Sequence, residues 1–238
     1  GIDIPNLLCP EENRGKITAL TNTTVLGCYE DGVITALTGE EKYFKIKADR
    51  AIFATGASEK FLSFAGNDLP GVYGAGAVQT LMNQYGVIPG NRVLMVGAGN
   101  IGIIVSYQLL QAGIAVTAVV EAAPNIGGYL VHASKLARAG VPILTRHTIL
   151  EAKGTEVVEA AVIARLDENW QVISGSEQEL EVDVVCLAVG LSPVVDLVRQ
   201  AGCATKYVPE LGGDVPIRDK ELKTSLDWIY VAGDVDPV

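Results

Sequence analysis

A glycine-rich turn between an apolar strand and a helix constrains the fold of this 238-residue chain more than any other feature. The turn is GAGNIG at residues 97–102. The surrounding pattern predicts a strand, a helix, a strand, a helix and a strand at residues 92–96, 101–112, 115–120, 129–139 and 141–145. This β-α-β-α-β order predicts an α/β fold with a parallel sheet, a three-layer Rossmann-like domain.

The three glycines of the turn suit the binding of a dinucleotide pyrophosphate, which carries two negative charges. Gly97 permits the tight turn, Gly99 lets the backbone approach the phosphates, and Gly102 lets the helix pack closely on the strand. The N-terminus of the next helix supplies unpaired N–H groups and about half a positive charge. A tight strand–helix turn without a ligand is the alternative interpretation.

Glu121 ends the second strand, 24 residues after Gly97. A carboxylate there can accept hydrogen bonds from the adenosine ribose, but it repels the 2′-phosphate of NADP(H). Two like charges about 4 Å apart cost about 4 kcal/mol at an effective dielectric of 20. The next residues are AAP, with no Arg or Lys to offset the repulsion. We therefore predict NAD(H) rather than NADP(H), with a solvated strand-end carboxylate as the alternative.

The chain on either side of this region consists mainly of short strand signals. Before the turn we expect strands at residues 17–20, 24–28, 33–37, 43–47 and 51–54, then a helix at 75–85. The first four predict a small β-meander. After it we expect a hairpin of residues 157–165 and 170–174 with Trp170 beside its turn, and strands at 183–189 and 230–232.

Charge and cysteine usage exclude several classes of partner. The net charge is −10, from 18 basic and 28 acidic side chains without a basic cluster, so we expect neither nucleic acid nor a membrane surface as partner. No run of about 18 apolar residues predicts a membrane span. Cys9, Cys28, Cys186 and Cys203 form no CxxC pair, so we expect no metal site and no local disulfide. Reduced, buried thiols in a cytoplasmic protein are the expectation.

Four segments carry a resemblance to a known superfamily. They are ATGA (54–57), GAGNIG (97–102), LAVGLSP (187–193) and TSLDWIYVAGD (224–234), in that order. The chain resembles the FAD/NAD-dependent pyridine nucleotide-disulfide oxidoreductases, in which an NAD domain is inserted into an FAD domain. Residues 64–90 and 201–225 resemble one branch. It contains the sarcosine oxidase α subunit, the flavoprotein subunits of hydrogen cyanide synthase and opine oxidase, and the corresponding dye-linked proline dehydrogenase subunit.

The resemblance implies two sets of cofactor contacts. The implied NAD contacts are Gly97, Gly99, Asn100, Ile101, Gly102, Glu121 and Gly190. The implied FAD contacts in the intact parent protein are Thr55, Gly56, Gly233 and Asp234, with Asp234 on the flavin ribitol. It also implies a partial FAD-domain segment at 1–67, an NAD-binding domain at 68–194 and a return segment at 195–238.

Three features of the superfamily are missing from the sequence: the N-terminal GxGxxG that holds FAD, the helix after Asp234, and the redox cysteine pair. We therefore interpret the chain as a fragment. We expect FAD in the intact parent protein and not in this chain alone. Because the redox cysteine pair is missing, we expect no disulfide-reductase chemistry from the cysteines of this chain.

The expected function is part of a flavin-dependent oxidoreductase that binds NAD(H) and transfers hydride between NAD(H) and FAD. A partner redox subunit in a hetero-oligomer would exchange electrons with it. The alternatives are a non-catalytic, NAD-binding scaffold subunit of an amine, imino-acid or opine oxidase or dehydrogenase, and an NAD sensor. The sequence assigns no catalytic residue, because the cofactors carry the chemistry. His132 and His147 are interpreted as surface or packing residues, and Cys186 as inert core.

Overall fold

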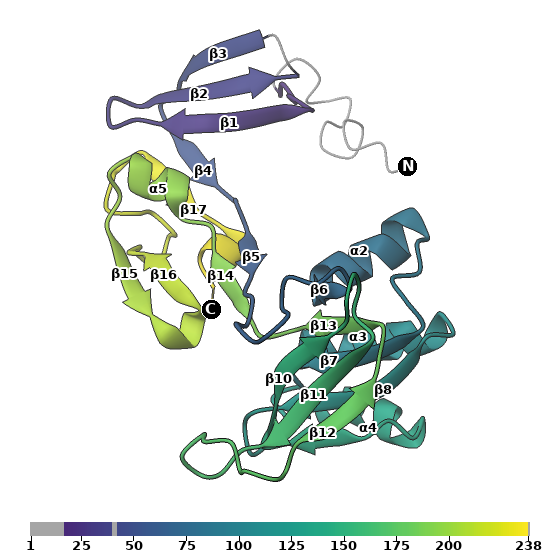
Figure 1. The fold of residues 1–238 in the computed structure, drawn as a ribbon. Coiled ribbons are helices and arrows are strands. Elements are labelled where there is room, and N and C mark those ends of the chain that lie inside the picture. Colours follow the sequence, from purple (N-terminus) through teal and green to yellow (C-terminus); the bar gives the residue numbers. More distant parts are fainter. Residues whose placement is uncertain (1–16, 40–41, 238) are drawn as a thin grey trace. The chain divides into compact units, whose positions relative to one another are not determined.

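The computed structural model describes residues 17–39 and 42–237, which form two compact units. Unit 1 combines the described residues up to Ser58 with those from Ser192 onward, and unit 2 is Glu59–Leu191 (Figure 1). β5 (Ala57–Glu59) pairs with β14 (Leu191–Pro193) where the chain passes from one unit to the other. The expected division at residues 67 and 194 into cofactor domains stays a prediction. Cys9 lies outside the described residues.

Unit 2 is built on a five-stranded parallel sheet, as the sequence predicts. In spatial order its strands are β6 (Val72–Gly74), β13 (Val184–Leu187), β7 (Arg92–Val96), β8 (Ala115–Glu121) and β9 (Ile143–Thr145). Val96 lies opposite Val120 of β8 and Leu187 of β13. The carboxyl ends of the three central strands are therefore level at one edge of the sheet.

Alternating side chains of the central strands fill two cores. Val93 and Met95 face a helical layer, whereas Leu94 and Val96 face the opposite side. The helical layer contains α2 (Ala75–Tyr85), α3 (Asn100–Gln111) and α4 (Leu130–Arg138). An antiparallel sheet of β10 (His147–Lys153), β11 (Ala160–Arg165) and β12 (Gln178–Glu181) covers the other face (Figure 1). The predicted three-layer α/β architecture is confirmed.

The expected hairpin of residues 157–165 and 170–174 is wrong in its second strand. β11 pairs with β10 on one side and with β12 on the other, and residues 170–174 contribute only one isolated bridge, Leu166 to Val172. The reason is local: the Asp167 carboxylate accepts the N–H groups of Asn169 and Gln171. These bonds hold the segment in a tight turn, with Trp170 at a positive φ of 63°.

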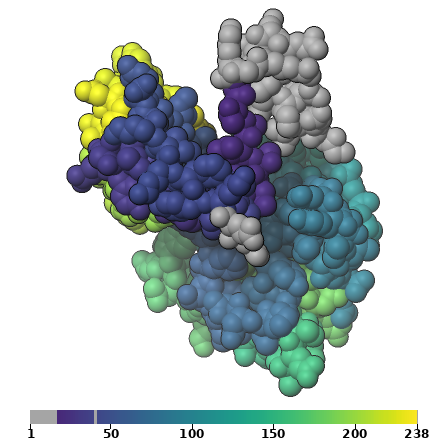
Figure 2. Space-filling model, turned by 90° about the horizontal axis from the view of Figure 1, so that it is seen from above, coloured from purple at the N-terminus to yellow at the C-terminus, as the bar shows by residue number. Residues whose placement is uncertain are grey.

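Unit 1 contains the predicted β-meander, with three strands in place of the expected four. Its strands are β1 (Thr23–Cys28), β2 (Val33–Thr38) and β3 (Lys42–Lys47), all antiparallel, whereas residues 18–20 form no strand and are exposed. β4 (Ala51–Phe53) pairs in parallel with β17 (Ile229–Val231), so the yellow C-terminal segment lies beside blue residues in Figure 2.

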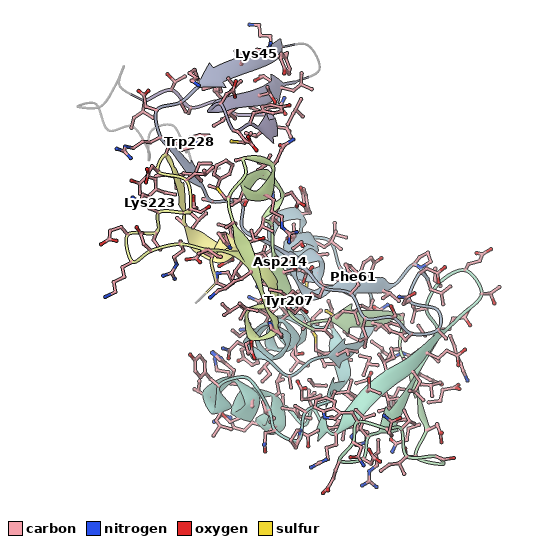
Figure 3. All side chains as sticks on the ribbon, turned by 90° about the vertical axis from the view of Figure 1, so that its left-hand side faces the viewer. Lys45, Phe61, Tyr207, Asp214, Lys223 and Trp228 are labelled. Atoms are coloured by element: carbon pink, nitrogen blue, oxygen red, sulfur yellow. The ribbon has the colours of Figure 1, made fainter. Side chains whose placement is uncertain are left out.

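The second chain segment of unit 1 adds small elements around this pair. They are α5 (Asp196–Gln200), β15 (Thr205–Val208), η2 (Pro209–Leu211), β16 (Gly213–Pro216) and η3 (Gly233–Val235). Tyr207 of β15 lies opposite Asp214 of β16, and both are labelled in Figure 3. Asp214 also forms an ion pair of 2.8 Å with Arg199 of α5, which ties this short hairpin to the helix.

The cysteines that the structure describes, Cys28, Cys186 and Cys203, are buried free thiols. Burial raises the pKa of the Cys186 thiol far above its ordinary value, which keeps the sulfur protonated and unreactive. Within the described ranges no group of His, Cys, Asp and Glu side chains is arranged to hold a metal ion. Among the same residues, no helix has the length and apolar character needed to cross a membrane.

Asp183 fixes the start of the central strand. Its carboxylate accepts the N–H of Arg92 at 2.8 Å, the N–H of Asn91 at 2.9 Å and the Asn91 side-chain amide at 3.2 Å. Burial alone would raise the pKa of Asp183, but these hydrogen bonds outweigh it, so the pKa lies below its ordinary value. Asp183 thereby anchors β7 beside β13.

We predict that Asp183→Asn lowers the free energy of unfolding at neutral pH by about 1–2 kcal/mol, because three charge-assisted hydrogen bonds weaken in a partly exposed position. A carboxylate with a lowered folded-state pKa stabilises the fold above its unfolded pKa and loses that effect as the pH falls through the folded value. Urea unfolding should therefore show that wild type and variant differ less in their free energy of unfolding in acid than at neutral pH. The exposed Glu168→Gln is the matched control. An equal stability loss in acid and at neutral pH would contradict this account.

Candidate nucleotide-binding site

A pocket of about 490 Å³ opens at the carboxyl edge of the parallel sheet in unit 2. Four of the predicted residues line it: Gly97, Gly99, Glu121 and Gly190. They follow β7, end β8 and follow β13, so three neighbouring strands deliver them to one place. Ligands of open α/β sheets bind at this edge, where connections leave a central strand in opposite directions.

Gly97 and Gly102 make a close approach of α3 to the sheet possible. Gly97 has a φ of 107°, and a side chain on it would collide with the carbonyl oxygen of Ala188. A side chain on Gly102 would collide with the carbonyl oxygen of Gly97. Both positions therefore require glycine, and the helix begins directly at the floor of the pocket.

Gly99 faces open space instead. A methyl group on it would find no atom within 4 Å, and it is the N-cap of the twelve-residue helix α3. No side chain caps α3, and its first turn contains no acidic residue. No acidic residue of the helix itself offsets its positive end, and the open space at Gly99 lets an anion reach it. The turn has the space and the polarity that a pyrophosphate needs.

Glu121 joins the two loops that border the pocket. Its Oε2 accepts the N–H of Ala98 at 2.8 Å, and its Oε1 accepts the N–H of Ala123 at 2.9 Å. A carboxylate has about four acceptor positions, so each oxygen retains room for a hydroxyl donor. The side chain can therefore hold the loops and still bind a ribose.

Asn100 and Ile101 do not line the pocket. The side-chain oxygen of Asn100 accepts the N–H of Tyr129 at 2.9 Å, at the start of α4. Ile101 lies in the first turn of α3 with 44% of its surface exposed. Asn100 therefore positions the neighbouring loop.

Sequence reasoning missed part of the lining of this pocket. His147 and Thr148, at the beginning of β10, line the pocket, as do Asn125 and Gly127 of the loop between β8 and α4. The sequence HTILEAK alternates too weakly to predict a strand. The available signal was that His147 comes two residues after the strand predicted at 141–145, whose carboxyl end lies at the ligand-binding edge.

The predicted FAD contacts lie in unit 1 and are only partly brought together. Gly233 and Asp234 follow β17 and line a pocket with Arg218 and Asp236, whose Nε and Oδ2 form an ion pair of 2.8 Å. Thr55 and Gly56 follow the paired strand β4 but do not line that pocket. The Thr55 hydroxyl donates to the carbonyl of Val194 at 2.6 Å. These residues alone therefore make only a partial cradle for a flavin.

A family model for pyridine nucleotide-disulphide oxidoreductases matches residues 6–237. The chain belongs to this family. Its enzymes are oxidoreductases that use FAD and NAD(P)H, in agreement with the class and cofactors expected from the sequence.

Curated relatives confirm the resemblance to the sarcosine and opine oxidase branch. The chain is 31% identical over 201 residues to the alpha subunit of sarcosine oxidase from Corynebacterium sp. (strain P-1), covering 78% of the chain and 20% of that protein. It is 30% identical over 206 residues to an opine oxidase subunit from Rhizobium meliloti (strain 1021), covering 78% and 43%. This chain thus spans less than half the length of these two relatives.

Solved structures show the same fold. An FAD-dependent pyridine nucleotide-disulphide oxidoreductase from Desulfovibrio vulgaris matches with a TM-score of 0.71 and 22% identity, over 92% of this chain and 54% of that chain. Thioredoxin reductase from T. acidophilum matches with a TM-score of 0.69 and 20% identity, over 90% and 66%.

Adding a methyl group should have different effects at the two glycines at the start of α3, on ligand binding at Gly99 and on stability at Gly102. Gly99→Ala should leave the thermal unfolding temperature nearly unchanged and weaken NADH binding about tenfold or more, because the methyl fills ligand space. Gly102→Ala should destabilise the unit by about 1–3 kcal/mol, because the methyl forces α3 away from the turn. Differential scanning calorimetry and isothermal titration measure the two effects. Equal thermal destabilisation by both variants would refute the distinction.

Proposed function

We propose that unit 2 binds NAD(H), with the pyrophosphate at the start of α3 and the adenosine ribose at Glu121. The observation that carries the proposal is one pocket in which a helix N-terminus without a side-chain cap lies beside a single carboxylate. Among its described lining residues there is no lysine or arginine to receive a 2′-phosphate. The pocket's charge therefore favours NAD(H) over NADP(H).

We further propose that the whole protein transfers hydride between NAD(H) and FAD. FAD supplies the two-electron chemistry when bound, so the protein needs no nucleophile of its own. The residues of this chain bind and orient the two cofactors. The α3 turn and Glu121 bind the nicotinamide nucleotide, and Gly233 and Asp234 contribute to a flavin site. Because Thr55 and Gly56 do not complete that cradle, we place FAD in the intact protein and expect this chain alone not to retain it.

A partner redox subunit is part of the proposal, because relatives at 30–31% identity are named as subunits of opine and sarcosine oxidases. The same naming favours a second candidate function. In it, the protein holds NAD without turnover as a scaffold, and oxidation occurs in another chain. For either candidate function we propose a cytoplasmic location for this protein, because free thiols such as those of the described cysteines persist in a reducing compartment.

NADH should bind at least tenfold more tightly than NADPH in isothermal titrations of this chain. Glu121→Gln should weaken NADH binding and reduce the ratio of the NADH and NADPH affinities, because the variant removes the negative charge that repels the 2′-phosphate. The exposed Glu168→Gln should leave both affinities unchanged. Wild-type affinities that are equal for the two nucleotides would refute the role of Glu121.

The two candidate functions differ in one observation on the intact, flavin-loaded protein. Hydride transfer predicts that anaerobic NADH bleaches the flavin absorbance near 450 nm. NADPH at equal concentration is the control and should bleach it more slowly. Flavin that stays oxidised at saturating NADH would overturn hydride transfer and favour the scaffold.

A further inference from the structure

His147 is a polar side chain in the pocket for which the proposed function gives no role. It is the first residue of β10 and lines the same pocket as Glu121. The chain has two histidines, and the other, His132, lies on α4 and does not line the pocket. The position of His147 therefore calls for a ligand-directed explanation.

The ring of His147 is held in one tautomer. Its Nδ1 lies 2.8 Å from the carbonyl oxygen of Thr145. A carbonyl can only accept a hydrogen bond, so Nδ1 carries the hydrogen. In the neutral ring Nε2 is then an acceptor, with its lone pair free for another group.

The turn that presents His147 is strained and firmly held. Arg146 has a φ of 55°, an uncommon conformation for a residue other than glycine. Its N–H donates to the carbonyl of Ala123 at 3.1 Å, and its carbonyl accepts the N–H of Leu166 at 2.7 Å. Strain maintained by such bonds is frequent at ligand sites.

The same backbone unit positions both polar groups of the pocket. Ala123 donates its N–H to Glu121 and accepts the N–H of Arg146 with its carbonyl. The Glu121 carboxylate and the turn that carries His147 are therefore fixed to one residue. The residues that line the pocket thus include a carboxylate and an imidazole, and each side chain has a hydrogen-bond acceptor.

We infer that His147 is a specificity-determining residue for the adenosine half of NAD(H). Its Nε2 accepts a hydrogen bond from a donor of adenosine, which offers two ribose hydroxyls and an amino group. This inference rests on the proposed function, since it assigns a role within the same nucleotide pocket. The repulsion of a 2′-phosphate is assigned to the Glu121 carboxylate, and His147 adds recognition of an adenosine donor.

Amide side chains can separate the two ring nitrogens in a test. Asn places its amide near the position of Nδ1 and can keep the bond to Thr145, whereas Gln reaches the position of Nε2. Titration with ADP-ribose, which lacks nicotinamide, should show His147→Asn weakening affinity about three- to tenfold. His147→Gln should restore most of the affinity, and His132→Asn is the control that should change nothing. NADH should follow ADP-ribose in each case.

Nitrogen NMR of the wild-type rings gives a readout that does not depend on a variant. At about pH 8 we expect two histidine spin systems, with His147 in the Nδ1–H tautomer. ADP-ribose should shift Nε2 of His147 and leave His132 in place. Bound ADP-ribose with an unmoved His147, or unchanged affinity of His147→Asn, would overturn the inference alone. If wild type bound neither NADH nor ADP-ribose, the proposed function would fall and this inference with it.

Discussion

The approach of α3 to the end of β7 is the constraint on which unit 2 depends. Gly102 lies against the carbonyl of Gly97, and Gly97 against the carbonyl of Ala188. These contacts bring the helix N-terminus to the edge where β7, β8 and β13 end. A larger residue at either glycine would move the helix, and with it the N–H groups that face the pocket. The fold and the geometry of the candidate site therefore depend on the same two positions.

Glu121 combines a structural role with the ligand-binding role that we propose for it. A half-buried carboxylate without donors would be costly, but the N–H groups of Ala98 and Ala123 compensate its desolvation. Those bonds also fix the two loops that border the pocket, and such preorganisation would reduce the ordering required for the binding that we propose. The carboxylate to which we assign nucleotide discrimination thus has a structural role of its own.

Local signals predict the centre of unit 2 and fail at its second layer. The strand at 92–96, the GAGNIG turn and Glu121 are contiguous or nearly so, and their physics is local: apolar runs, positive φ and a helix start. β10 is stabilised by pairing with β11 and by packing on the parallel sheet, and its own sequence carries little of that information. The sequence alone therefore gives His147 no role beyond packing or the surface. The second strand of the expected hairpin fails for the opposite reason, since Asp167 makes a local turn stronger than the apparent strand pattern.

Unit 1 presents a problem of chain connectivity that unit 2 solves. β4 and β17 pair in register, Ala51 with Ile229, although unit 2 lies between them in the sequence. Closing so long a flexible loop would carry a large entropy cost. Unit 2 removes much of it by folding, because its own ends meet where the N–H of Lys60 donates to the carbonyl of Gly190 at 3.0 Å. Gly190 also lines the nucleotide pocket. Gly190, one residue before the end of unit 2, therefore takes part both in the closure that joins the two segments of unit 1 and in the lining of the candidate pocket.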